Sequence, residues 1–356
     1  MLKKLLLGFL FLASCRFGFS QKSSKELDQR GEGIVEKVMV LPVIFDTDMG
    51  PDYDDVGAIA LLHAFADTGK VNILATMASN KYEGVAAVLN LFNTYFHRPG
   101  IPIGVPKGDA VDQRDSQHWT DSLLAKYPHA IKLNSEVPDA VILYRKILSK
   151  QPDESVIIIT VGFLTNLSGL LHSGPDDYSR LNGLELVRKK VRRLVSMAGK
   201  FPSGREFNVF KDAPASQYVF ANWPSPVLFS GFEIGQNIKC GLPLVRNEGI
   251  QNSPVKDVFR ICLPLADEDH LGRMSWDETA VLVALSGYRR FYTVKEGRMQ
   301  VAADGSNTWL ETGKGQSYLV ADKPASEVQD LIDVLIMHQP NLPHSSCLYV
   351  SPGEDN

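Results

Sequence analysis

The sequence predicts an α/β fold, in which a mostly parallel, Rossmann-like sheet carries helices on both faces. The expected strands are continuous apolar runs, such as residues 155–160 (SVIIIT). Runs of this kind are typical of a parallel sheet that is buried on both faces. They alternate along the chain with helical stretches, which is the order that βα units require. The 356 residues show no internal repeat and no linker-like stretch, so one large domain is expected.

The first half of this domain begins with the apolar run 38–45, an expected strand that stops at Asp46. A helix is expected at 54–66, where apolar residues recur at helical spacing. By the same criteria of period and length, further strands are expected at 71–77, 101–105 and 155–160, and further helices at 83–96, 138–150 and 164–172.

The second half continues the alternation and then changes character. Strands are expected at 194–197 and 227–230, and helices at 213–222 and 325–337. The region 291–321 is β-rich and contains the turn signals DGS (304–306) and GKG (313–315). It predicts a small β-hairpin added to the sheet near the C-terminus. The domain is therefore expected to span 38–340, followed by a tail at 341–356.

The first twenty residues are typical of a secretory signal peptide. Lys3 and Lys4 precede an apolar run from Leu5 to Ala13, which is too short for a stable membrane anchor. Residues 12–15 (LASC) resemble a bacterial lipobox with Cys15 as the lipidated residue, whereas residues 18–20 (GFS) offer ordinary cleavage. We expect export to the periplasm or to the outer membrane as a lipoprotein, with membrane contact only through Cys15. The polar residues 21–37 are expected to form a disordered tether.

Composition excludes two classes of function. A net charge of −4 leaves no excess of Lys and Arg for the phosphates of a nucleic acid polymer. Cys240, Cys262 and Cys347 form no CxxC pair, which disfavours a zinc or redox site. A disulfide among these three stays open, and so does assembly into a homo-oligomer.

The strongest chemical feature follows the first expected strand. Residues 46–55 (DTDMGPDYDD) hold five carboxylates within ten residues, at the sheet edge where ligands bind in parallel α/β folds. Such a cluster favours a hard cation, and calcium suits a mixture of carboxylates, a carbonyl and water. A solvated acidic turn is the simpler alternative. The Asp-x-Asp loop of haloacid-dehalogenase-like phosphatases is another, although that family expects a Thr where Gly50-Pro51 stands here.

This segment resembles the N-terminal aspartate motif of the inosine–uridine nucleoside hydrolases, and later segments match the same family in order. Asn80 follows the second strand, as the ribose-contacting Asn of the family does. Residues 160–166 (TVGFLTN) resemble the segment whose backbone carbonyl binds calcium, and 206–210 (EFNVF) the segment that holds ribose. Trp276-Asp277 stands where the family has His-Asp. The resemblance covers roughly 40–340 and implies the nucleoside hydrolase fold.

The resemblance also implies a calcium-dependent N-ribohydrolase with a small riboside as its substrate. Calcium is expected on Asp48, Asp55, the Val161 carbonyl and Asp277, and Asp48 is the expected base that deprotonates the attacking water. Residues expected to bind substrate are Asp54, Asn80, Met197, Glu206, Asn208 and Trp276.

The sequence departs from the family pattern at two places. Two residues are inserted between Gly50 and Asp54, which leaves open whether Asp52 or Asp54 faces the sugar; Asp54 is favoured because it is adjacent to Asp55. Trp276 replaces a His that serves as a candidate leaving-group acid in some relatives, and an indole can stack on a base but cannot protonate it. Purine ribosides are therefore expected as the preferred substrates, with His118 as an alternative acid. An exported riboside-binding protein without turnover, and a hydrolase of another N-riboside, remain the competing functions.

Overall fold

The computed structural model describes residues 40–340. The expected signal peptide with Cys15, the tether, Cys347 and the tail at 341–356 lie outside the described residues. The strands are β1 (Leu41–Thr47), β2 (Val71–Ala78), β3 (Ile103–Gly104), β4 (Val156–Thr160), β5 (Val191–Met197), β6 (Ser203–Arg205), β7 (Val227–Ser230), β8 (Lys239–Cys240), β9 (Arg273–Met274), β10 (Tyr292–Val301), β11 (Ser306–Leu310) and β12 (Gln316–Ala321).

The helices include every one expected from the sequence and several that were not. They are α1 (Asp54–Asp67), α2 (Val85–Tyr95), α3 (Trp119–Lys126), α4 (Ala140–Leu148), α5 (Thr165–His172), α6 (Gly183–Lys190), α7 (Phe207–Lys211), α8 (Ala213–Asn222), α9 (Phe232–Gly235), α10 (Leu242–Arg246), α11 (Pro254–Cys262), α12 (Trp276–Ser286) and α13 (Ala325–Ile336). Short 3-10 turns lie at Asn134–Glu136, Leu263–Leu265 and Asp267–Asp269. No helix of the described range 40–340 has the length and apolarity to cross a membrane.

The main sheet confirms the predicted α/β class. Its strand order is β3-β2-β1-β4-β5-β7-β12-β10-β11-β6, and the strands from β3 to β12 are all parallel. β10 and β11 form the expected hairpin. β12 then returns and pairs in parallel with β7, so the C-terminal β region is built into the main sheet rather than appended to it.

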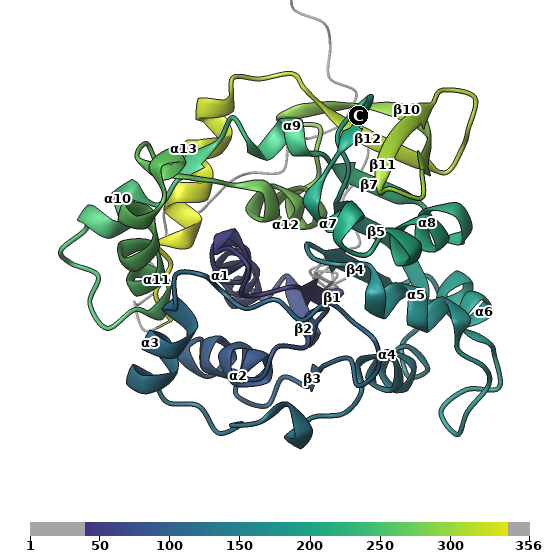
Figure 1. Cartoon of the computed structure of the whole chain (residues 1–356), viewed down its shortest axis with the longest axis horizontal. Helices are drawn as coiled ribbons and strands as arrows, with labels where there is room; N and C mark the ends of the chain where they lie inside the picture. The colour runs from purple at the N-terminus through teal and green to yellow at the C-terminus, as the bar shows by residue number, and fades with distance from the viewer. Residues whose placement is uncertain (1–39, 341–356) are drawn as a thin grey trace, which may run out of the picture. The chain divides into compact units, whose positions relative to one another are not determined.

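Helices cover both faces of the sheet (Figure 1). One hydrophobic core joins the sheet to α1, α2, α11, α12 and α13, and the other joins it to α4, α5, α6 and α8. Helix α12 gave no amphipathic signal in the sequence because its residues from Asp277 to Ala284 are all buried. It packs beside α1, and both helices begin at the edge of the sheet where the parallel strands end.

Among the described residues, Cys240 and Cys262 are buried free thiols. Burial raises the pKa of both thiols, which disfavours the reactive thiolate. Both thiols are therefore weak nucleophiles in this fold.

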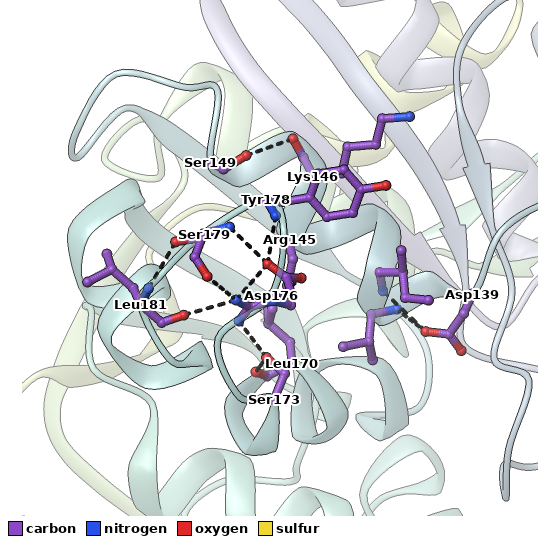
Figure 2. Close-up of polar contacts among 12 residues, drawn as sticks. Asp139, Arg145, Lys146, Ser149, Leu170, Ser173, Asp176, Tyr178, Ser179 and Leu181 are labelled. Atoms are coloured by element: carbon purple, nitrogen blue, oxygen red, sulfur yellow. Dashed lines mark hydrogen bonds and ion pairs between the residues drawn. The ribbon is translucent and has the colours of Figure 1, made fainter.

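Figure 2 shows how α4 holds the loop between α5 and α6. The buried Arg145 guanidinium donates to both carboxylate oxygens of Asp176 at 2.6 and 3.1 Å. It also donates to the Ser173 hydroxyl at 2.9 Å and to the carbonyls of Ser179 and Leu181 at 3.1 and 2.9 Å. One side chain thus satisfies acceptors along the whole loop.

We expect Arg145→Ala to lower the free energy of unfolding by about 3 kcal/mol, because it leaves several partly buried acceptors without a donor. Urea denaturation followed by circular dichroism measures this loss. Lys146→Ala, at the exposed neighbouring position, is the matched control and should change stability by about 0.5 kcal/mol or less. Equal stability of the two variants would contradict the role of Arg145 in holding the loop between α5 and α6.

Candidate active site

A cavity of about 260 Å³ lies at the carboxyl ends of β1, β4 and β5. It is lined by Asp48, Asp52, Asp54, Val161, Met197, Glu206, Phe207, Asn208, Phe232, Glu268, Arg273, Met274, Trp276 and Asp277. The structure thus brings together all of the site residues expected from the sequence except Asp55 and Asn80. A larger open groove of about 660 Å³ between α5 and α8 contains none of them.

The aspartate loop is held in place by the end of β1. This strand runs two residues further than expected, so that Asp46 and Thr47 are its last residues. The Thr47 hydroxyl donates to Oδ1 of Asp55, the second residue of α1, and accepts from the Met49 N–H at 3.0 Å. Asp55 therefore lies just behind the cavity wall, fully buried, and its Oδ2 has no hydrogen-bond partner among the described residues.

Burial makes these carboxylates hard to ionise without compensation. It raises the pKa of Asp48 well above its usual range, and the charge of Asp55 raises it further. Burial, with the charge of Asp54 next in size, raises the pKa of Asp55 to about 7. The same two causes raise the pKa of Asp277. The carboxyls of Asp48, Asp55 and Asp277 therefore cannot all ionise easily side by side. A cation bound among them would balance their charge.

The first turn of α12 meets the first turn of α1 through Asp54. Its Oδ2 accepts the Asp277 N–H at 3.3 Å, and its Oδ1 accepts from Nε and Nη2 of Arg273 at 3.2 and 2.8 Å. Nη2 of Arg273 also lies 2.8 Å from the half-exposed carboxylate of Asp52. Both candidate aspartates thus line the cavity, and Asp54 is the buried one.

The end of β4 forms another wall. A Cβ at Gly162 would lie 2.3 Å from the Asp48 nitrogen, so only glycine lets this loop approach the aspartate loop so closely. The Val161 carbonyl accepts from Nδ2 of Asn208 at 3.0 Å. The same amide donates to the Met197 carbonyl at 3.2 Å and so ties the ends of β4 and β5 together.

Glu206 is the N-cap of α7. Its Oε1 accepts the Asn208 N–H at 2.8 Å, and its Oε2 accepts the N–H groups of Gly199 and Val209 at 3.0 and 3.3 Å. Burial raises the pKa of Glu206 to about 7, although these N–H groups act in the opposite direction. The carboxyl is therefore fixed in orientation at the cavity wall.

The remaining wall is aromatic. Nε1 of Trp276 donates to the Phe232 carbonyl at 2.8 Å, and the Trp276 and Phe232 rings stack with their centroids 5.1 Å apart. Phe207, on the first turn of α7, adds another ring to the lining. A flat apolar surface with few donors is suited to contact with a planar base.

Besides Asp55, three residues considered in the sequence lie outside the cavity. Asn80 is fully buried, and its side-chain amide donates to the backbone carbonyls of Asp48 at 3.2 Å and Gln113 at 2.6 Å. It therefore supports the aspartate loop, and the expectation that it contacts ribose is corrected. The Asp46 carboxylate turns away to accept from Tyr144 at 2.7 Å. His118 is 72% exposed and lies near Asp121, so it is not a leaving-group acid for this cavity.

The sequence reasoning missed Arg273, together with Phe232, Glu268 and Met274. The inserted pair Asp52-Tyr53 was the available signal, because one more carboxylate beside buried aspartates requires a counter-charge. In the structure, Asp52 is paired with Arg273, and the Tyr53 hydroxyl donates to Asp269 at 2.6 Å. The inserted residues and the segment before Trp276 therefore form one set of contacts.

An acid-lined cavity at the carboxyl edge of a parallel sheet, with an aromatic wall, defines a small-molecule hydrolase site of the glycosidase kind. The model of the inosine-uridine preferring nucleoside hydrolase family matches residues 43–334. The chain belongs to this family and is an N-glycosyl hydrolase that acts on small nucleoside substrates.

Individual proteins are similar to the chain in sequence or in fold. The chain is 25% identical to the pyrimidine-specific ribonucleoside hydrolase RihA of Citrobacter koseri, over 83% of this chain and 95% of that protein. Its fold is similar to that of the inosine-uridine preferring nucleoside hydrolase of Bacillus anthracis, with a TM-score of 0.63 and 15% identity over 84% of this chain and 99% of the other. The purine-preferring ribonucleoside hydrolase of Gardnerella vaginalis gives a TM-score of 0.64 and 16% identity over 83% and 99%.

Proposed function

We propose that this protein is a calcium-dependent ribonucleoside hydrolase that prefers purine ribosides. The observation that carries the proposal is the convergence of Asp48, Asp54, Asp277, Glu206 and Asn208 on one cavity, although they lie on separate elements. Acidic and amide groups in this arrangement can hold a cation, grip sugar hydroxyls and accept the proton of a water.

The donor set fits calcium. Asp48, Asp55, Asp277 and the Val161 carbonyl are all hard oxygen ligands, and Asp55 Oδ2 is buried without a partner. Within residues 40–340, no three acidic, His or Cys side chains already form a metal cage. Calcium is therefore proposed on the chemistry of the donors; when bound, the ion supplies positive charge that makes a nearby water easier to deprotonate.

The side chains of the cavity have different roles in the proposed reaction. Asp48 takes the proton of the attacking water, whose oxygen bonds to the anomeric carbon as the bond to the base breaks. Asp54, Glu206 and Oδ1 of Asn208 accept hydrogen bonds from ribose hydroxyls. Such bonds accelerate hydrolysis where they strengthen as the sugar flattens toward an oxocarbenium ion. Water and riboside thus give ribose and the free base.

A reducing-sugar assay with several ribosides tests the proposal. The purified protein should release ribose, lose activity in a calcium chelator and regain it with added calcium, with about one calcium per chain by elemental analysis. Stoichiometric zinc, or full activity of a metal-free preparation, would contradict the metal assignment. Riboside binding without turnover would favour an exported binding protein instead.

The purine preference has its own test. Trp276, Phe232 and Phe207 all line the cavity, and the larger ring system of a purine can contact more of this aromatic wall, so inosine or guanosine should be turned over faster than uridine. Trp276→Ala should lower purine turnover by roughly ten- to hundredfold, because base–aromatic stacking is worth about 1–3 kcal/mol. Trp276→Phe keeps a ring and is the matched control. Faster turnover of uridine, as the name of the Citrobacter relative would suggest, would overturn the preference.

A further inference from the structure

The proposed reaction leaves the departing base without an obvious acid. The only side-chain N–H of Trp276 donates to the Phe232 carbonyl, and the His118 side chain is exposed. Breaking the glycosidic bond leaves the bonding electron pair on the base, and its negative charge spreads over the ring nitrogens and carbonyl oxygens. A group in the cavity that stabilises this charge would take over the role of an acid.

Arg273 is the cationic side chain that lines the cavity. Its guanidinium is held on one edge, where Nε and Nη2 donate to Asp54 and Nη2 pairs with Asp52. Its faces are held as well, because the guanidinium carbon lies 5.0 Å from the centroid of the Tyr53 ring and 5.2 Å from that of Trp276. The group is therefore fixed beside the ring proposed to stack on the base.

The other edge of this guanidinium is available. Nη1 makes no hydrogen bond within the described part of the chain, and the carboxylate nearest to it is Asp269 Oδ2 at 3.7 Å. Arg273 itself lines the cavity, so a group bound there can approach the guanidinium. A fixed cation thus presents unused N–H groups to the cavity.

We propose that Arg273 is the leaving-group catalyst of this site, a role that rests on the proposed hydrolase function. Its Nη1 donates a hydrogen bond to a ring nitrogen or carbonyl oxygen of the base as the bond between the anomeric carbon and the base nitrogen breaks. The guanidinium stays protonated throughout, and the released base takes its proton from solvent. The water proton goes to Asp48, which afterwards releases it to solvent, so the balance is one water consumed for one ribose and one base. The ligand class is a nucleobase with an acceptor atom near the glycosidic nitrogen.

The test compares two ribosides that share the sugar and differ in the need for help at the leaving group. Inosine has a poor leaving group, whereas p-nitrophenyl β-ribofuranoside releases a stable phenolate without assistance. In Arg273→Lys, the ammonium keeps the positive charge between Asp52 and Asp54. It lacks the second nitrogen of the guanidinium, the one that would donate to the base. We expect kcat for inosine to fall about a hundredfold, the scale of one lost donor to a developing anion, and kcat for the nitrophenyl riboside to fall less than about threefold.

The nitrophenyl substrate also reports whether fold and sugar site are intact in the same preparation. Arg273→Met should show the same selectivity with a larger loss on inosine. Glu206→Gln is the matched comparison: Glu206 is a proposed ribose ligand whose hydrogen bonds go to Gly199, Asn208 and Val209 rather than to Arg273, so weaker ribose binding should lower the rates of both substrates alike. Equal losses on both substrates in Arg273→Lys, or an unchanged rate on inosine, would overturn the role of Arg273. Wild-type protein inactive on both ribosides would instead overturn the proposed function and this role with it.

Discussion

Asp48→Asn is expected to lower kcat for riboside hydrolysis by about a thousandfold, within the range that general base catalysis supplies. The side chain is buried in the cavity wall at the end of β1, and an amide of the same shape cannot take the proton of the attacking water. Steady-state assays with the best riboside measure the loss. The fold should be retained, because the loop is held by its backbone: the Asp48 carbonyl accepts from the Asn80 amide, and the Met49 N–H donates to the Thr47 hydroxyl.

The control for this variant is Asp112→Asn, which makes the same change of charge at an exposed loop position. It should leave kcat unaltered. Calcium content must be measured for both, because Asp48 is also a proposed ligand and a metal-free variant would be inactive for a second reason. Near-normal turnover of a calcium-loaded Asp48→Asn protein would remove Asp48 from the role of base.

Glu206→Gln is expected to lower kcat/KM by about a hundredfold. Hydrogen bonds to charged groups are worth about 1.5–3 kcal/mol, and a carboxylate accepts from ribose hydroxyls more strongly than an amide does. The carboxylate also caps α7 and holds the Gly199 N–H, so the variant should lose about 1 kcal/mol of stability. Kinetic assays and urea denaturation of the same preparation separate the two effects.

Asp212→Ala provides the comparison for that variant. Asp212 caps α8, the next helix, and does not line the cavity. It should share the loss of stability and keep kcat/KM within about threefold, because a capping residue contributes about 1 kcal/mol wherever it stands. If both variants lose activity in proportion to stability, Glu206 is only a cap.

Local patterns in the sequence were sufficient for the architecture. Buried parallel strands are continuous apolar runs, and the helices that cover them show a 3.6-residue period, so both are visible without tertiary information. The same logic placed the aspartate segment with Asp48 at one edge, because every parallel strand of such a sheet ends on the same side. Val161 and Met197 came from the resemblance to the nucleoside hydrolase family. Helix α12 escaped this reasoning, since a helix buried on all sides has no amphipathic period.

The sequence by itself therefore determined the sheet, the edge that carries the site and most of the cavity wall. Only the tertiary structure decided how those side chains are used. Asn80 follows a strand as expected, yet its side-chain amide donates hydrogen bonds to the backbone carbonyls of two loops. Arg273 meets Asp54 across 219 residues of chain, and no local pattern records that contact. Strand ends are placed by the backbone, but the direction of a side chain and its partners depends on packing between distant segments.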